Sequence, residues 1–292
     1  FCLSRGLVDV YKRRTYTETE NDLIVKANKR TFIFSKKDGQ LKGVSVDNRK
    51  ISFANGPRFI GARRADRSLD QFYNHDDEKA KEKDRTYSEF PDAAVFTKLD
   101  VKQDGGDLIV TANYKLGNLD KAQWTINPSG DLALDYTYNF SGVVDLMGIR
   151  FDYPEDQVIS KRWLGAGPYR VWQNRIHGTQ YDIWENDYND PIPGETFTYP
   201  EFKGYFGNVS WMNIQTKEGT ISLTNETPDT YIGVYQPRDG RDRLLYTLPE
   251  SGISVLNVIP PVRNKVNSTD LCGPSSQPKC CLLYTSDAAD EL

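Results

Sequence analysis

Cysteine, histidine and methionine are scarce in this sequence, and the shortage argues against several kinds of site. The 292 residues contain four cysteines, two histidines and two methionines. The cysteines are Cys2, Cys272, Cys280 and Cys281. All four lie near the ends of the chain, so no internal disulfide framework is predicted. His75 and His177 stand far apart, which argues against a histidine-based metal site. Neither a metal nor a cofactor is expected.

Long apolar runs and a large net charge are missing as well. The chain has no run of 18 apolar residues, so no membrane-spanning segment is predicted. Its net charge of −4 is small and negative, which argues against a nucleic-acid surface. The nucleophile pattern G-x-S-x-G is absent, and so is a repeated strand–helix alternation, so neither an α/β-hydrolase nor a catalytic (β/α) barrel is predicted.

The residues that are abundant favour β-strands. From Leu23 onward, short apolar runs alternate with turn signals, and Asp38-Gly39 between two such runs predicts a hairpin. Residues 131–140 alternate between large apolar and smaller or polar side chains, which is typical of a strand with one buried face. Strands at intervals of about ten residues predict an all-β protein, a large antiparallel β-sandwich or barrel.

Three segments are predicted along the chain. Residues 1–22 are interpreted as the end of a preceding β domain with its linker, residues 23–274 as the β domain, and residues 275–292 as a disordered tail. The last part, 280–292, resembles read-through from adapter DNA and is not expected to be native. Within the domain, Asn55-Gly56-Pro57 is expected to end a strand and open a charged loop.

The stretch 163–211 concentrates aromatic and charged residues between glycines and prolines, and it contains four of the five tryptophans. Such a composition predicts loops and short strands that carry large rings. Rings beside carboxylates and guanidiniums suit a sugar, because CH faces stack on a ring and hydroxyls bond to charged groups. An aromatic core of a β-protein explains the same composition, and both interpretations stay open here.

Three motifs in this order resemble the last domain of family 2 β-galactosidases, also called the small chain. The first is the hairpin KRTFIFSKKDGQLKGVSVDNRKI, followed by ARRADRS at 62–68. The second is Gly165-Ala166-Gly167-Pro168 followed by YRVWQNR, and the third is PEFKG at 200–204. The resemblance implies a galactose mutarotase-like supersandwich. It also implies a non-catalytic domain that binds carbohydrate or packs on a catalytic barrel and helps shape its sugar site.

In that family a pair of glutamates on the barrel carries out retaining hydrolysis of a β-galactoside or a related oligosaccharide, with the two carboxyl groups about 5 Å apart. The barrel would lie upstream of this chain, so the chain alone is expected to be inactive. The expected partners are this barrel and, through it, the sugar, with no nucleic acid and no membrane. A bacterial periplasmic or secreted location is the working hypothesis.

The resemblance and the residue types together mark a set of candidate carbohydrate-binding residues. They are Arg64, Asp66, Tyr169, Arg170, Trp172, Arg175 and Glu201. Where the family carries a substrate-facing tryptophan, residues 250–258 offer Val255 or Leu256, which leaves another glycoside open, for example one with a uronic acid. Two alternatives remain: a free-standing mutarotase-like epimerase that uses His177 and Glu201 as acid and base, and a supersandwich module of a polysaccharide lyase.

Overall fold

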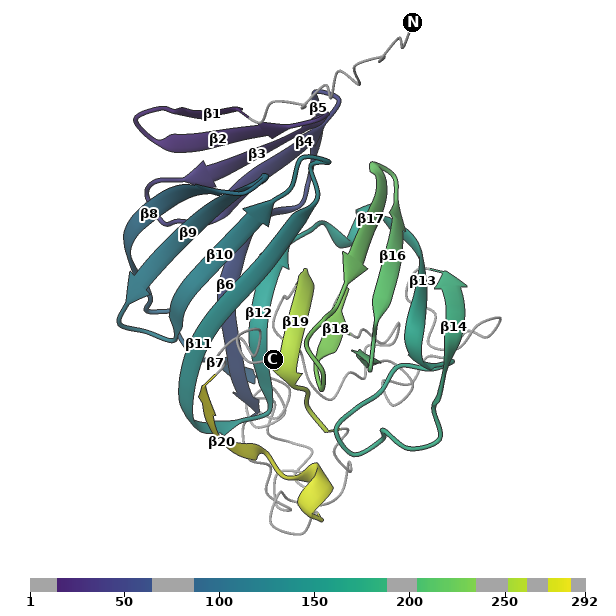
Figure 1. Cartoon of the computed structure of the whole chain (residues 1–292). Coiled ribbons are helices and arrows are strands. Elements are labelled where there is room, and N and C mark those ends of the chain that lie inside the picture. Colours follow the sequence, from purple (N-terminus) through teal and green to yellow (C-terminus); the bar gives the residue numbers. More distant parts are fainter. Residues whose placement is uncertain (1–14, 65–86, 188–203, 235–251, 262–272, 285–292) are drawn as a thin grey trace, which may run out of the picture.

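The fold is built from antiparallel β-strands (Figure 1). A computed structural model describes residues 15–64, 87–187, 204–234, 252–261 and 273–284 of the chain. Within these ranges the only helical elements are two single 3-10 turns, η1 (Glu155–Gln157) and η4 (Pro274–Ser276). The strands form three sheets, so the prediction of an all-β antiparallel sandwich is confirmed.

The largest sheet has 11 strands and runs through the centre of the molecule. Its strand order is β1 (Thr15–Glu18), β2 (Asp22–Ala27), β3 (Arg30–Ser35), β4 (Leu41–Val46), β6 (Ala54–Arg64), β12 (Leu146–Asp152), β19 (Ile253–Val258), β18 (Tyr231–Gly233) and β15 (Phe206–Gly207). Two short strands are added at the side, β5 (Arg49–Ile51) on β4 and β7 (Tyr87–Glu89) on β6. The predicted hairpin at Asp38-Gly39 is confirmed as the β3–β4 turn, where Gly39 has a φ of 73°.

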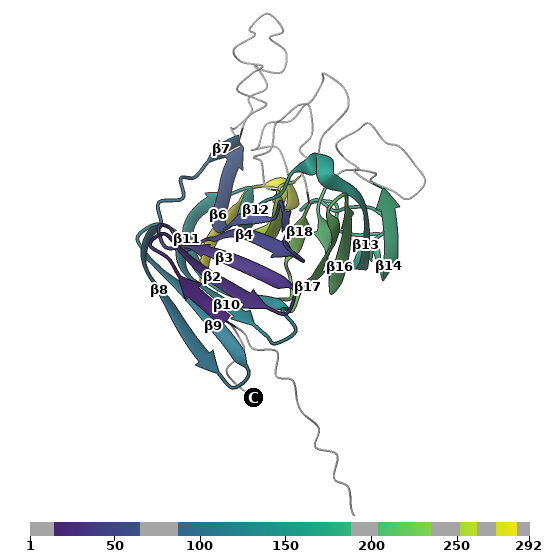
Figure 2. The ribbon, with the colours of Figure 1, turned by 90° about the horizontal axis from the view of Figure 1, so that it is seen from above.

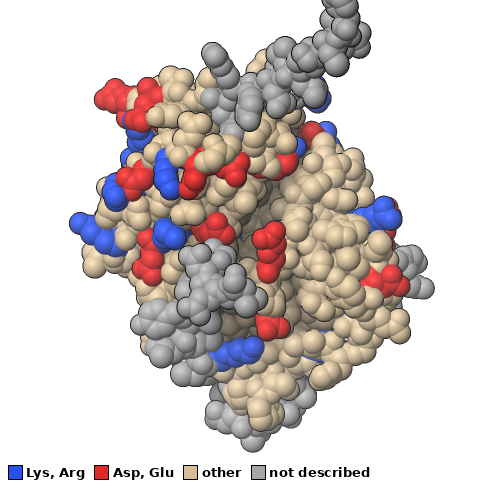
Figure 3. Space-filling view, in the orientation of Figure 1, with Lys and Arg blue, Asp and Glu red and all other residues tan. Residues whose placement is uncertain are grey.

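Two smaller sheets complete the sandwich (Figure 2). The five-stranded sheet has the order β20 (Lys279–Tyr284), β11 (Leu132–Val144), β10 (Leu119–Ile126), β9 (Asp107–Lys115) and β8 (Val95–Asp104). The four-stranded sheet has the order β14 (Gln180–Asp187), β13 (Val158–Gly167), β16 (Trp211–Thr216) and β17 (Gly219–Thr224). Charged side chains gather over the five-stranded sheet, whereas the surface over β16 and β17 carries few of them (Figure 3).

The main core fills the space between the five-stranded sheet and the first half of the large sheet. Rings from both layers meet there: Phe59 of β6 lies 5.6 Å from Tyr138 of β11, and Phe34 of β3 lies 6.0 Å from Trp124 of β10, measured between ring centroids. Tyr138 belongs to the alternating segment that was predicted as a strand with one buried face, and its side chain is fully buried. The alternation therefore identified the core-facing side correctly.

A second core lies between the four-stranded sheet and the other half of the large sheet. Trp163 of β13 is fully buried and packs edge to face against Phe206 of β15, with centroids 4.8 Å apart. Val255 of β19 contacts both cores. The two small sheets therefore cover the same face of the large sheet, and its other face is left for the loops.

One predicted boundary is wrong. Residues 58–64, expected to open a charged loop after Gly56-Pro57, continue β6 as a strand. The Gly-Pro pair lies where the β6–β12 register shifts, between Arg150 and Asp152, so it marks an irregularity inside a strand and not its end. Gly56 is needed there because a Cβ would lie 2.3 Å from the Phe151 ring.

The ends of the chain contribute strands to the same sheets. Residues 15–18, assigned from the sequence to a linker, form β1 and pair with β2. Residues 279–284, assigned to a tail, form β20 and pair with β11. The backbone of these edge strands is therefore hydrogen-bonded within the sandwich, where the sequence pattern indicated no regular structure.

Glu218 in the β16–β17 turn ties the four-stranded sheet to the large one. Its carboxylate accepts hydrogen bonds from the Ser52 N–H at 2.9 Å, the Ser52 hydroxyl at 2.6 Å and the Tyr153 hydroxyl at 3.1 Å. Burial acts to raise the pKa of Glu218, but the hydrogen bonds from Ser52 and Tyr153 outweigh it, and the pKa is lowered from its ordinary 4.5.

Replacing Glu218 by glutamine is expected to lower the free energy of unfolding by about 1 kcal/mol at pH 7, since the amide nitrogen would face hydrogen-bond donors. A lowered pKa stabilises the fold above the unfolded value near 4.5, and this contribution is lost as the pH falls through the folded pKa. The difference in free energy of unfolding between wild type and E218Q, measured with urea, should therefore become smaller below pH 4.5. An equal difference at pH 7 and pH 3.5 would contradict the stabilising role of the ionised Glu218 carboxylate. The control is Glu226→Gln, the same change at an exposed position.

Candidate functional site

The loop that follows β13 covers the free face of the large sheet. It begins at Pro168, and its backbone is held by two hydrogen bonds between Val171 and Tyr205, of 2.8 and 2.9 Å. The Gln173 N–H donates to the carbonyl of Pro260 at 3.1 Å, and the Gln173 side-chain amide donates to Gln277 at 3.0 Å. The loop is thus anchored at several points along its length.

Trp172 lies at the centre of this anchorage and is fully buried. Its ring packs edge to face on Tyr205, with centroids 5.8 Å apart at 84°. The surrounding cluster contains Ile60, Ala62, Leu146, Val171, Leu256 and Ile259. In this arrangement Trp172 has no ring face at the surface, and its contribution is to packing.

The other three candidates of the loop have different surroundings. Arg170 is buried, with 2% exposed, and its guanidinium lies 5.9 Å from the centre of the Phe206 ring, a cation–π contact. Tyr169 is half-buried and its hydroxyl lies against Gly178, while Arg175 is exposed. Of the four candidates, Tyr169 and Arg175 therefore reach the surface. His177, the acid of the epimerase alternative, is also exposed.

The remaining candidates lie at or beyond the limits of the described chain. Arg64 is the last residue of β6, and its backbone pairs with that of Tyr87 in β7. The side chain of Arg64, and Asp66 and Glu201 altogether, lie outside the described residues. We expect Arg64 and Glu201 to lie on the same face of the sandwich as Trp172, which the described residues do not test.

The structure also reveals a charged row that was not expected from the sequence. Arg58 of β6 and Arg150 of β12 are direct neighbours across the two strands. Arg58 pairs with Asp152, and Arg150 pairs with Glu89 at 3.7 Å. Because side chains alternate along β6, Arg58 shares a face with Ile60, and so the row lies beside the Trp172 cluster.

Asp92 adds a third carboxylate to this row. Its oxygens accept the backbone N–H groups of Phe59 at 3.2 Å and Ala94 at 3.4 Å. Partial burial raises the pKa of Asp92, while these N–H groups and the positive charges of Arg150 and Arg58 oppose the rise. With each arginine paired to a carboxylate, the row offers both donors and acceptors, which suits hydroxyl groups better than an isolated anion.

Ser254 of β19 extends the row toward the middle of the sheet. It is the neighbour of Arg150 on one side and of Gly233 on the other. Ser254 is fully buried, and its hydroxyl makes no hydrogen bond within the described part of the chain. A Cβ on Gly233 would lie 2.4 Å from that hydroxyl, so the glycine leaves room for it. A serine within an apolar strand gave no signal in the sequence.

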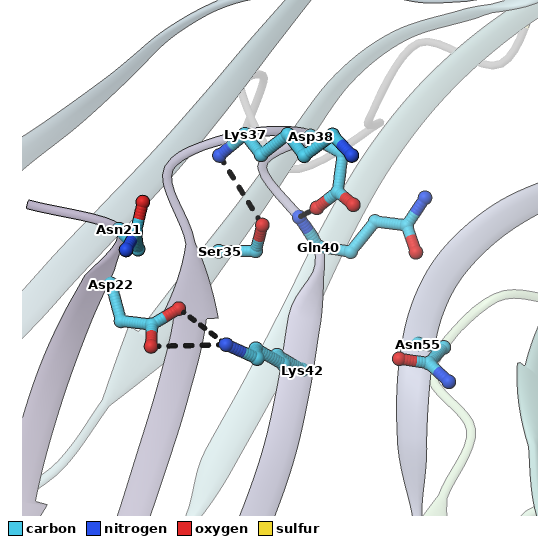
Figure 4. Close-up of a pocket in the computed structure, with 8 residues that line it drawn as sticks. All are labelled: Asn21, Asp22, Ser35, Lys37, Asp38, Gln40, Lys42 and Asn55. Carbon is cyan, nitrogen blue, oxygen red and sulfur yellow. Dashed lines mark hydrogen bonds and ion pairs between the residues drawn. The ribbon is translucent and has the colours of Figure 1, made fainter.

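A polar recess of about 410 Å³ lies elsewhere, by the β3–β4 turn (Figure 4). Lys42 pairs with Asp22 at 2.9 Å, and the Asp38 carboxylate accepts the backbone N–H of Gln40 at 3.1 Å. These contacts brace the turn and the strands beside it. Because these polar side chains bond to neighbouring residues of the recess, we interpret them as groups that stabilise the hairpin.

Among the residues that the structure describes, no group of three or more His, Cys, Asp or Glu side chains is placed to hold a metal ion. No helix in those same ranges is long and apolar enough to cross a lipid bilayer.

Comparison with known families identifies the sandwich. The family model described as β-galactosidase small chain matches residues 26–258, from the end of β2 to the end of β19. A search of curated proteins finds no match. The matched segment includes the hairpin, the Gly-x-Gly-Pro segment and the Pro-Glu segment on which the resemblance rests. Since this match spans most of the sequence and both cores of the sandwich, the chain belongs to the β-galactosidase small chain family.

Proposed function

We propose that this chain acts as the non-catalytic small-chain domain of a β-galactosidase-type glycoside hydrolase. In this role it packs against a catalytic barrel supplied by another domain or chain and helps to shape the sugar site. The observation that carries the proposal is the family match over residues 26–258. Retaining hydrolysis needs a pair of carboxyl groups about 5 Å apart, which we assign to the barrel.

The face that we assign to the barrel is the one that carries the loop after β13. It combines the paired charges around Arg58 and Arg150 with the exposed Arg175. Paired charges at the rim of an interface favour a complementary partner and select against others. Tyr169 and Arg175 are the described candidates that we expect at the contact with the barrel or the sugar.

The purified chain alone is expected to show no hydrolysis of nitrophenyl β-galactoside, and added catalytic chain should produce activity that exceeds that of the catalytic chain by itself. Turnover by the small chain alone would contradict the proposal, as would an unchanged rate on mixing. Activity plotted against the concentration of added small chain gives the strength of assembly.

A charge reversal maps the contact face in the same assay. Arg175→Glu should raise the concentration of small chain needed for half-maximal activation by about tenfold, equivalent to about 1.4 kcal/mol. Lys102→Glu, the same charge reversal on an exposed residue of β8, should leave the concentration for half-maximal activation unchanged. Equal effects of both reversals would place the contact face elsewhere.

A further inference from the structure

The four-stranded sheet has one face in the core and one face turned outward. Trp163, Trp184 and Met212 lie on the inner side, where they pack in the second core. Residues directly opposite each other in antiparallel strands share a face, and side chains alternate along each strand. The register therefore places Leu164, Ile183 and Trp211 in one outer row. Tyr181 follows in the next outer row of β14.

Tyr181 presents a ring that is exposed but held. Its side chain is 52% exposed, and its hydroxyl lies 2.6 Å from the hydroxyl of Ser210. Tyr181 of β14 lies opposite Ala166 of β13. Ser210 immediately precedes β16, which pairs with the other side of β13. The ring must therefore cross over β13 at the small Ala166, along the sheet surface, where most side chains stand upright. About half of Tyr181 is thus open to solvent while its hydroxyl is held by Ser210.

Trp211 and the strands beside it extend this surface. Trp211 is partly exposed and lies in the outer row adjacent to that of Tyr181. The other outer side chains of β16 and β17 are uncharged hydrogen-bonding groups. They are Asn213, Gln215, Thr220, Ser222 and Thr224. Along β16 these outer positions recur about every 6.7 Å, and this side of the molecule carries few charged residues (Figure 3).

We propose that this face, defined by Tyr181, Trp211 and the uncharged outer side chains of β16 and β17, binds an extended, uncharged polysaccharide. Sugar CH faces would stack on the rings of Tyr181 and Trp211, and sugar hydroxyls would bond to the amides and hydroxyls beyond them. The β16–β17 outer side chains carry no charge, and the row that contains Asn213 continues into Arg162 of β13 and Glu185 of β14, which stand opposite each other with opposite charges. A face without net charge matches a neutral glycan and disfavours an anionic one. The proposal is independent of the small-chain role, because this face belongs to a different sheet from the loop face.

Affinity gel electrophoresis of the full chain tests the proposal, with soluble β-1,4-galactan and hydroxyethyl cellulose in the gel. Wild type should be retarded by at least one of the two polysaccharides. Tyr181→Ala and Trp211→Ala should each weaken the retardation about tenfold in dissociation constant, the loss expected for one stacking ring. Tyr181→Phe, which keeps the ring and removes only its link to Ser210, should lose less.

Tyr16→Ala is the matched control, since Tyr16 of β1 is a strand tyrosine with nearly the same exposure, 51%. It should migrate as wild type does in both gels. Absence of retardation of wild type in both gels would overturn the proposal, and so would equal losses of retardation in Y16A and Y181A. Loss of assembly with the catalytic chain in Y181A and W211A, without glycan binding by wild type, would identify the face as a protein interface and overturn it too.

Discussion

Replacing Trp172 by alanine is expected to lower the free energy of unfolding by about 3–5 kcal/mol, as is usual when a fully buried tryptophan is removed. The ring is fully buried and packs on Tyr205. Its loss would leave a cavity lined by residues of β6, β12 and β19 and would loosen the loop that they support. Urea unfolding followed by circular dichroism measures the change, provided that the slope with denaturant stays constant.

Two further variants show whether Trp172 acts through packing. Trp172→Phe keeps a ring against Tyr205 and should lose clearly less stability than the alanine variant. Trp211→Ala removes a partly exposed tryptophan from the outer face and should cost about 1 kcal/mol, since less apolar area is involved. If W172A were as stable as wild type, the ring would not be part of the core, and a stacking role on sugar would gain support.

Replacing Gly148 by alanine should lower the free energy of unfolding by about 3 kcal/mol, at the upper end of the usual range for overpacking. Gly148 lies in β12, at the register shift against β19. A Cβ there would lie 2.2 Å from the carbonyl oxygen of Val255 and 2.6 Å from the Cα of Leu256. Both contacts are with backbone, so the two central strands would have to move apart. Thermal and urea unfolding both measure the loss.

Gly43→Ala is the control because the same change is made in a strand of the same sheet. Among the described residues, no heavy atom lies within 4 Å of the Cβ that alanine would add at Gly43 of β4. This variant should be as stable as wild type or gain up to about 1 kcal/mol, since alanine in a strand loses less conformational freedom than glycine. A G148A protein as stable as G43A would mean that β12 and β19 are not packed as described.

The parts of the fold that have a local pattern in the sequence were predictable. The alternation in residues 131–140 predicts a strand and its buried side, because the two-residue period of a strand is visible in the sequence. The Gly56-Pro57 pair was misinterpreted as a strand end because a turn and an irregularity inside a strand use the same residues. The backbone pairing of β1 was missed because a short edge strand needs little apolar patterning, and that of β20 was missed because residues 280–292 were interpreted as adapter read-through.

The candidate site was predictable in composition but not in arrangement. The stretch rich in tryptophan was recognised, but its tryptophans lie in different environments. Trp163 and Trp172 are buried, whereas Trp211 lies on the outer face. Arg58 and Arg150 were overlooked because they stand 92 positions apart and meet only through the β6–β12 register. No local pattern reports such a pairing.

The sequence alone determined that this protein is built from antiparallel strands and that it resembles the small chain of a β-galactosidase, because side-chain alternation and short motifs are local properties of the chain. Only the tertiary structure decided which rings are buried, which charges are paired and which sheet face stays open. These properties depend on register and layer order, and a shift of one residue in register would turn every side chain of a strand to the other face.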